Sequence, residues 1–251
     1  MSKNHQICFV LLPGFAPDNY PVLAFKSELE KMGHFAVAAN FWGIDEVKDF
    51  SKLTSEDCRR GVSALINDLS QKFEVVIGVG ISLGGAFLME YAKNNDGLDY
   101  VISIGTPFKL RKRGLISVGF IGLPILNAIW SILYKFTSWR LLPIGASKMV
   151  AEYLEGDFLK NLEKMNTPVL LTQSKNDGVT DYRVLEKFIA KFPNSRKKIV
   201  YMKNTDHVIG YDVKIIMEQL QNFVGPDVMN ISRSDFLKGE GALKTRAQIV
   251  D

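Results

Sequence analysis

The chain has 251 residues, of which 47% are hydrophobic and 23% are charged. A chain of this length and composition can bury a large core, and a single α/β domain is the default organisation. The net charge of +4 is modest, and the one dense basic cluster, KLRKR at 109–113, matches no nucleic-acid-binding module, which excludes nucleic acid as an expected partner.

The two cysteines lie in apolar surroundings: Cys8 falls in an apolar run and Cys58 on an apolar helical face, with no second cysteine near either. This spacing argues against a disulfide framework or a cysteine metal site, so we expect both thiols to be reduced, buried and structural. The apolar segment after Lys3 is very short and runs into Pro13 and Gly14 without a cleavage signal. We interpret it as a first strand and expect a cytoplasmic protein.

Hydrophobic runs and helical periodicities alternate along the chain. The first helix is predicted to begin at Pro21 and to end at Gly33, and the next to begin at a capping box of Thr54 and Asp57. Strand-like runs that alternate with helices predict a parallel sheet covered by helices on both faces. The predicted strands are residues 6–12, 35–41, 75–81, 100–107, 167–174 and 198–202.

The stretch 74–92 places a serine where a buried strand turns into a helix. The chain there reads Gly80-Ile81-Ser82-Leu83-Gly84. G-x-S-x-G at such a turn is typical of a nucleophile elbow, in which the glycines let the backbone bend sharply enough to expose the serine oxygen. Ser82 is therefore the predicted nucleophile, and the alternative is a glycine-softened strand with an inert serine.

A serine hydroxyl needs a base within hydrogen-bond reach, and the chain has three histidines. His5 precedes the first predicted strand and His34 follows the first predicted helix, so we expect both at the surface or at element boundaries. His207 directly follows the strand KIVYM, at the edge where a parallel sheet carries its functional loops. It is the predicted base.

The carboxylate that orients this base should lie on another loop at the same edge. Asp177 follows the strand TPVLLTQS, which gives the order serine, aspartate, histidine. Asp181 is the rival, as the possible N-cap of the next helix, whereas Asp206 is a neighbour of His207 whose side chain should point away.

The oxyanion that forms on attack at a carbonyl needs backbone N–H donors. One is predicted at Leu83, directly after the nucleophile. The other is predicted on the loop after the first strand, where Gly14 and Phe15 permit close approach.

Together these motifs resemble the α/β-hydrolase superfamily, and more narrowly the small carboxylesterases and monoacylglycerol lipases. Those proteins read L-x-H-G-F, G-x-S-x-G-G, G-x-x-D and H-V in order, and this chain reads LLPGF, GISLGG, SKNDGV and DHVIGYD. The resemblance covers roughly residues 7 to 224. It departs at Pro13, which replaces the usual histidine, and at Asn176, where many relatives have other residues.

The resemblance implies a triad of Ser82, Asp177 and His207, and an oxyanion hole formed by the main-chain N–H groups of Phe15 and Leu83. It implies hydrolysis of a carboxylic ester, with monoacylglycerol or another lipid ester as a plausible small-molecule substrate and with no metal or organic cofactor. A thioesterase, an amidase or aminopeptidase, a perhydrolase and a non-catalytic ligand-binding hydrolase fold remain alternatives.

Residues 114–134 contain no charged residue and follow the basic cluster, which by hydropathy would suit a membrane span. A single crossing would separate Ser82 from Asp177 and His207, so we interpret about 108–146 as a helical cap inserted after the strand at 100–107. The alternative is that the apolar side chains of this cap only pack against the core and bind no substrate. Its candidate acyl-pocket residues are Phe120, Leu123, Ile125 and Trp130.

Such a cap can expose an apolar patch, and with the basic cluster beside it can rest reversibly on an anionic membrane surface. Apart from the cap, we predict one hydrolase domain over residues 1–225. Residues 226–251 lack clear periodicity and are predicted to be a C-terminal tail.

Overall fold

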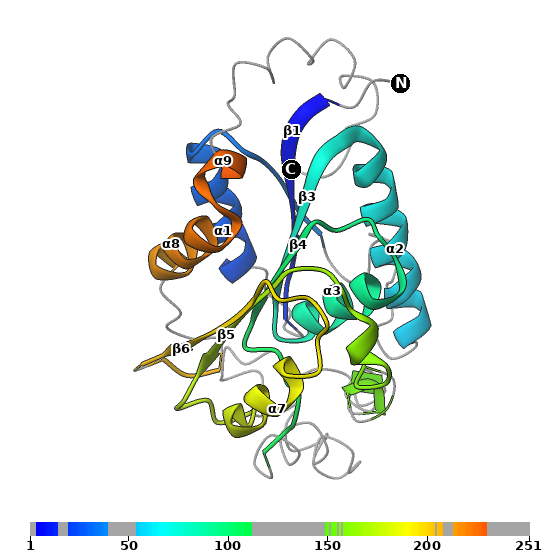
Figure 1. Cartoon of the computed structure of the whole chain (residues 1–251), viewed down its shortest axis with the longest axis vertical. Coiled ribbons are helices and arrows are strands. Elements are labelled where there is room, and N and C mark those ends of the chain that lie inside the picture. Colours follow the sequence, from blue (N-terminus) through cyan, green and yellow to red (C-terminus); the bar gives the residue numbers. More distant parts are fainter. Residues whose placement is uncertain are drawn as a thin grey trace, which may run out of the picture.

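A parallel sheet with helices on both faces organises this chain (Figure 1). The computed structural model describes residues 4–14, 20–39, 54–111, 149–150, 152–154, 156, 158–203, 205–207 and 213–229.

The sheet has six strands in the order β2-β1-β3-β4-β5-β6, and every neighbouring pair is parallel. The chain runs from β1 outward to β2 and then returns to place β3 on the other side of β1. Loops at the carboxyl ends of β1 and β3 therefore diverge, which is where open α/β sheets form their sites. The strands are β1 (Asn4–Leu12), β2 (Phe35–Ala38), β3 (Phe73–Ile81), β4 (Tyr100–Ile104), β5 (Val169–Ser174) and β6 (Lys197–Met202).

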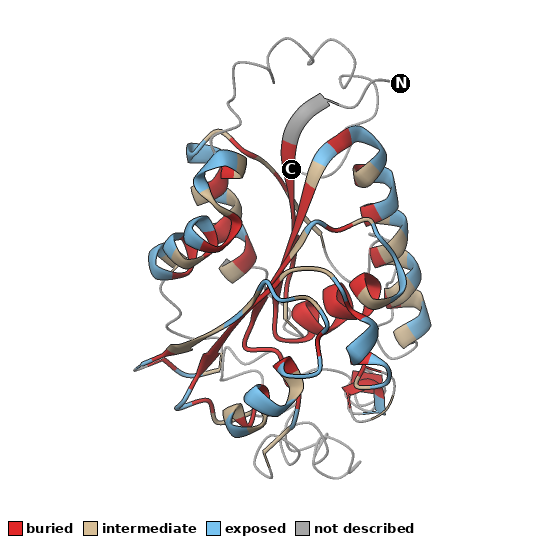
Figure 2. Cartoon of the chain, in the orientation of Figure 1, coloured by how far each residue is buried: buried red, intermediate tan, exposed pale blue. Residues whose placement is uncertain are grey.

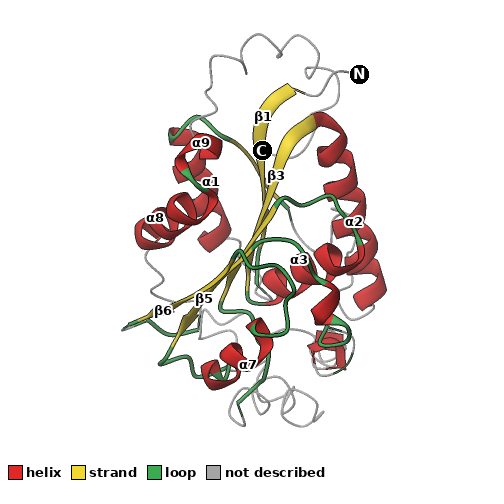
Figure 3. Ribbon diagram, viewed as in Figure 1, coloured by secondary structure: helices red, strands yellow, loops and turns green. Residues whose placement is uncertain are grey.

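Helices cover both faces of this sheet, as the ribbon in Figure 3 shows. One core contains residues of α2, α3 and α7, and the other contains residues of α1, α8 and α9. The helices are α1 (Tyr20–Lys31), α2 (Ser55–Lys72), α3 (Leu83–Asn94), α7 (Leu185–Ile189), α8 (Val213–Val224) and α9 (Pro226–Met229), with 3-10 turns η3 (Leu162–Lys164) and η4 (Tyr182–Val184). The predicted α/β class and parallel sheet are confirmed.

The helix α3 is the most deeply enclosed of the described helices (Figure 2). Every residue from Leu83 to Ala92 is buried. On the neighbouring helix α2, the predicted capping box is present, because Thr54 Oγ1 accepts from the Asp57 N–H and the Asp57 carboxylate accepts from the Thr54 N–H, both at 3.1 Å. The cap fixes where α2 begins, and α2 packs over α3.

Two other expectations meet the structure with different outcomes. Cys8 and Cys58 are free and buried as predicted, and burial raises the pKa of each thiol to about 12. Residues 226–229 of the predicted tail form α9, where Met229 is buried, and residues 230–251 lie outside the described residues.

No helix in the described part of the chain is long and apolar enough to cross a membrane. The apolar run at 114–134 lies outside the described residues, as do the four candidate acyl-pocket residues Phe120, Leu123, Ile125 and Trp130.

His34 lies at an element boundary, between α1 and β2, as expected, but its side chain is buried rather than at the surface. The residue is 8% exposed, and its ring lies 5.3 Å from the ring of Phe9, centroid to centroid. Gly33 has a φ of 88°, which ends α1 and turns the chain back toward the sheet. Burial lowers the pKa of His34 below its ordinary value of 6.5.

Replacing His34 by leucine should therefore reduce the loss of stability in mild acid. Below about pH 6.5 the unfolded chain binds a proton at this ring while the folded chain resists it, so wild type loses stability as the pH falls. Urea unfolding at pH 7 and pH 5 measures this, and the stability of His34→Leu relative to wild type should rise between the two. Parallel pH dependences for the two proteins would contradict the prediction.

Candidate active site

Ser82 lies between β3 and α3 in a conformation that L-residues rarely adopt, with φ 51° and ψ −115°. Backbone and side-chain contacts hold it there. Its N–H donates to Ile104 O at 2.7 Å, and its carbonyl accepts from Thr106 Oγ1 and from the Gly85 N–H, both at 3.1 Å. The turn therefore projects the serine away from the end of the strand, as the elbow motif predicts.

The glycines around this turn are required by close packing of main chain on main chain. A Cβ atom on Gly80 would lie 2.6 Å from Gly84 O, and one on Gly84 would lie 2.6 Å from Pro13 O and closer still to Leu12 O. On the facing loop, a Cβ on Gly14 would lie 3.3 Å from Ser82 Cβ. The loop after β1 thus packs directly against the elbow.

We expect Gly84→Ala to destabilise the protein strongly, because its methyl group would overlap backbone atoms that cannot move independently. The free energy of unfolding, measured by urea denaturation, should fall by at least about 1–3 kcal/mol. Gly178→Ala is the matched control, since its Cβ would meet only Asp206 Oδ1, at 3.8 Å. Equal effects of the two substitutions would show that packing at the elbow is not the cause.

The structure brings Ser82, His207 and Asp177 together in one hydrogen-bonded chain. Ser82 Oγ lies 2.9 Å from His207 Nε2, and His207 Nδ1 lies 2.8 Å from Asp177 Oδ2. With Nδ1–H donating to the carboxylate, Nε2 is the nitrogen that can accept the hydroxyl proton. Asp177 is fully buried and the His207 side chain is 18% exposed, so the chain of contacts runs from the interior toward solvent.

The Asp177 carboxylate is saturated with donors. Oδ1 accepts from the N–H groups of Val179 and Thr180, at 2.8 and 2.9 Å. Oδ2 accepts from Thr180 Oγ1, Gln173 Nε2 and His207 Nδ1. Burial acts to raise the pKa of Asp177, but the hydrogen bond and charge of His207 and the hydrogen bonds of Thr180 outweigh it, so the pKa lies below its ordinary value. The carboxylate therefore stays ionised.

The two other aspartates considered as orienters have different partners. Asp181 accepts from the N–H of Arg183 and from its guanidinium, which lower the pKa of this carboxyl to about 2, and it caps η4. Asp206 accepts from the N–H groups of His207 and Gly178, at 2.8 and 3.3 Å. Its carboxylate therefore joins the loop that carries His207 to the loop that carries Asp177, which we call the aspartate loop.

One of the two predicted oxyanion donors lies within the described residues. Leu83 is the first residue of α3, so its N–H has no partner inside the helix and lies directly after Ser82. Phe15, the other predicted donor, lies outside the described residues, although Gly14 before it is described.

Several buried polar side chains that no sequence pattern singled out surround Ser82 and Asp177. Ser103 Oγ donates to Thr106 Oγ1 at 2.6 Å, and Thr106 donates in turn to the Ser82 carbonyl. Gln173 and Thr180 surround Asp177 in the same way. The only sequence signal for these residues was the presence of polar side chains at or just beyond the ends of otherwise apolar strands.

The loop that carries Asp177 is also tied to the segment after β4. Leu110 and Thr180 form an isolated antiparallel bridge. The Arg111 N–H donates to Val179 O and the Asp181 N–H donates to Lys109 O, both at 2.8 Å. The start of the predicted cap is therefore fixed to the aspartate loop.

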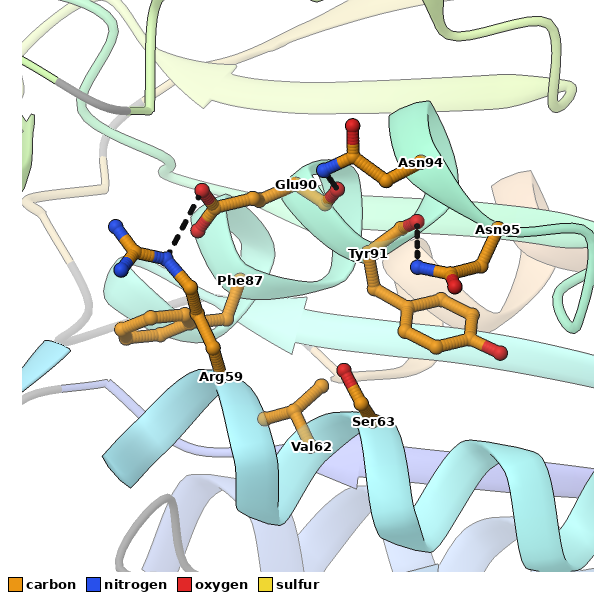
Figure 4. A pocket seen from close by; sticks show the side chains of 8 residues that line it. All are labelled: Arg59, Val62, Ser63, Phe87, Glu90, Tyr91, Asn94 and Asn95. Atoms are coloured by element: carbon orange, nitrogen blue, oxygen red, sulfur yellow. Dashed lines mark hydrogen bonds and ion pairs between the residues drawn. The ribbon is translucent and has the colours of Figure 1, made fainter. Parts of the chain in front are cut away.

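A separate small pocket of about 60 Å³ lies between α2 and α3 (Figure 4). Arg59 on α2 donates to the Glu90 carboxylate on α3 at 3.2 Å across it. None of Ser82, Asp177 and His207 lines this pocket, and we interpret it as a structural contact of the two helices. Within the described ranges, no group of three or more His, Cys, Asp or Glu side chains could hold a metal ion.

No family model matches the sequence, and no curated protein matches it significantly. Solved structures do. One of the metagenome-derived lipolytic enzymes LipS and LipT superposes with a TM-score of 0.71 at 17% identity, over 89% of this chain and 95% of that chain. A soluble variant of monoglyceride lipase from Saccharomyces cerevisiae, in complex with a substrate analogue, gives 0.68 at 12% identity, over 92% and 88%. A bromoperoxidase from Bacillus anthracis gives 0.62 at 17% identity, over 88% and 93%.

The three neighbours share an architecture with this chain and differ in their stated activities. At identities this low the likeness concerns the fold and leaves the reaction to be argued from the site. Each superposition covers at least 88% of this chain and at least 88% of the neighbour, so the likeness extends over the whole parallel sheet and its helices. This chain has the α/β-hydrolase fold.

Proposed function

We propose that this chain is a serine hydrolase that cleaves carboxylic esters through an acyl-enzyme on Ser82. The observation that carries the proposal is the continuous hydrogen-bonded chain from Ser82 Oγ through both ring nitrogens of His207 to Asp177. A nucleophile, a base in reach of it and a buried carboxylate that orients the base form the minimal machinery of acyl transfer.

In the proposed reaction, Ser82 Oγ attacks the ester carbonyl while His207 Nε2 takes the hydroxyl proton. Asp177 stabilises the protonated ring, and the N–H groups of Leu83 and Phe15 stabilise the oxyanion. The ring then gives its proton to the departing alcohol, which leaves an acyl group on Ser82. Water activated by the same nitrogen hydrolyses this intermediate and restores the serine.

For the substrate, we propose a small-molecule ester of carboxylesterase or monoacylglycerol-lipase type. Two of the compared neighbours are called a lipolytic enzyme and a monoglyceride lipase, and this supports the choice without deciding it. The apolar side chains at Phe120, Leu123, Ile125 and Trp130 are the proposed acyl-binding residues. A cytoplasmic enzyme whose cap contacts membranes peripherally completes the proposal.

Labelling with a fluorophosphonate probe, followed by hydrolysis rates across esters of increasing acyl length, tests this function. Ser82→Ala is the blank in both assays. We expect labelling that disappears in the variant, and faster hydrolysis of apolar acyl chains than of acetyl esters. Thioester, amide and peracid-forming assays run in parallel distinguish the alternative reactions. Folded protein with neither labelling nor turnover would instead indicate a ligand-binding protein.

A further inference from the structure

Gln173 is a buried polar side chain near the carboxyl end of β5. It lies in β5 and is 1% exposed, and an amide in such a place is unfavourable unless its hydrogens are bonded. Its Nε2 donates to Asp177 Oδ2 at 2.5 Å and to Thr180 Oγ1 at 2.6 Å. Both of its amide hydrogens are thus used on the aspartate loop, and a rotated amide would place its oxygen against the carboxylate.

The direction of the Thr180 hydroxyl follows from this arrangement. Its oxygen accepts from Gln173, so its own hydrogen is left to donate to Asp177 Oδ2, at 2.6 Å. Thr180 is 2% exposed, which keeps water from replacing either contact. Gln173, Thr180 and the carboxylate therefore close a ring of three hydrogen bonds.

This ring acts on the same oxygen that contacts His207. Asp177 Oδ2 receives three donors, namely the ring nitrogen Nδ1, the Gln173 amide and the Thr180 hydroxyl. The bonds from Gln173 and Thr180 fix the plane of the carboxylate. They also stabilise part of its negative charge, so less of that charge is left to stabilise the protonated His207 ring.

We propose that Gln173 and Thr180 are positioning residues that hold Asp177 toward His207 and limit how strongly the carboxylate stabilises the protonated ring. The proposal rests on the proposed function, since it concerns the acid limb of the same reaction. Gln173 and Thr180 act through their contacts with Asp177, and neither is hydrogen-bonded to Ser82.

Two other described carboxylates, those of Asp206 and Asp181, lie near Asp177 and His207 but take no part in the ring of hydrogen bonds. Asp206 accepts from the His207 backbone N–H and not from its ring. Asp181 is paired with Arg183. Because neither group contacts Gln173 or the Thr180 side chain in these bonds, substitutions at the two positions leave both contacts in place.

Thr180→Val and Thr180→Ser form a matched pair that separates positioning from packing. Valine keeps the volume and loses the donor, whereas serine keeps the donor and loses a methyl group. Gln173→Met likewise keeps the volume and loses both donors. We expect the valine and methionine variants to lower kcat by roughly 10- to 100-fold, as misplacement of a catalytic group does, and Thr180→Ser to retain most of the activity.

The pH profile is the readout that a purely structural role would not move. Removing a donor from Oδ2 concentrates negative charge beside the protonated His207 ring and favours it. The acid limb of kcat/KM should therefore move to higher pH in Thr180→Val and Gln173→Met, and stay in place in Thr180→Ser. NMR titration of the His207 ring in protein labelled at its histidines gives the same measurement without a substrate.

The outcomes separate this proposal from the proposed function. If Ser82→Ala hydrolyses esters like wild type, the proposed function fails, and the NMR titration alone then decides the positioning role. If Ser82 is required but both apolar variants keep the wild-type rate and titration, the positioning role is overturned. Should Thr180→Val not fold, Gln173→Met carries the test; if neither folds, the ring serves folding rather than His207, which also overturns it.

Discussion

Ser82→Ala should lower kcat for ester hydrolysis by about 10⁴- to 10⁶-fold, the range seen when the nucleophile of a triad is removed. The variant loses the hydroxyl oxygen that lies 2.9 Å from His207 Nε2 and is the proposed attacking atom. Alanine is no more strained than serine at this φ, and the neighbouring glycines are unchanged, so the urea midpoint should stay close to wild type. Turnover of a fluorogenic ester measures the loss.

His207→Ala should lower kcat to a similar extent, and the double variant should be little worse than either single one. Residues that act as one unit do not contribute additively. Ser70→Ala, on the exposed part of α2, is the control for the loss of a serine hydroxyl elsewhere. A double variant far slower than both single variants would show that Ser82 and His207 act independently.

Asp177→Asn should lower kcat by about 10⁴-fold, the effect of the equivalent change in a well-studied triad. The two backbone N–H groups at Oδ1 will hold the amide oxygen on their side. The amide nitrogen must then take the place of Oδ2, where it faces donors from Gln173, Thr180 and His207. The histidine can relieve this conflict only by giving up its Nδ1 hydrogen, which leaves Nε2 protonated and unable to accept from Ser82.

Asp181→Asn is the matched control for this prediction, because its carboxylate lies four residues away and is bonded to Arg183. We expect it to retain most of the wild-type kcat and to lose some stability. Comparable losses of kcat in the two variants would indicate a general effect of charge on the loop instead of an orienting role for Asp177.

The sequence predicted those features that depend on position along a strand. Ser82, Asp177 and His207 each follow a strand of a parallel sheet, so pattern alone places them at one edge, and the structure brings them into contact. The glycines of the elbow were predictable for the same reason. Asp177 could be preferred to Asp181 on position, but the contact itself required the fold.

Features that depend on side-chain direction could not be predicted in this way. His34 follows a helix, and only the turn at Gly33 shows that its ring points into the core. Gln173 looks like an ordinary polar residue near a strand end until the aspartate loop folds back over it. The helix α9 has four residues, which is too short for any periodicity to mark it.

The bridge between Leu110 and Thr180 bears on how the proposed activity could evolve toward other substrates. The bridge holds the chain to the loop that carries Asp177 just before residues 112–148 begin. Differences in sequence and length beyond Arg111 are therefore separated by a fixed point from the hydrogen-bonded chain of Ser82, His207 and Asp177. If residues 112–148 bind the acyl group as proposed, changes there can alter substrate preference without moving Asp177 or His207. For recombination with related hydrolases, the natural crossover lies after Arg111 and not at the end of β4.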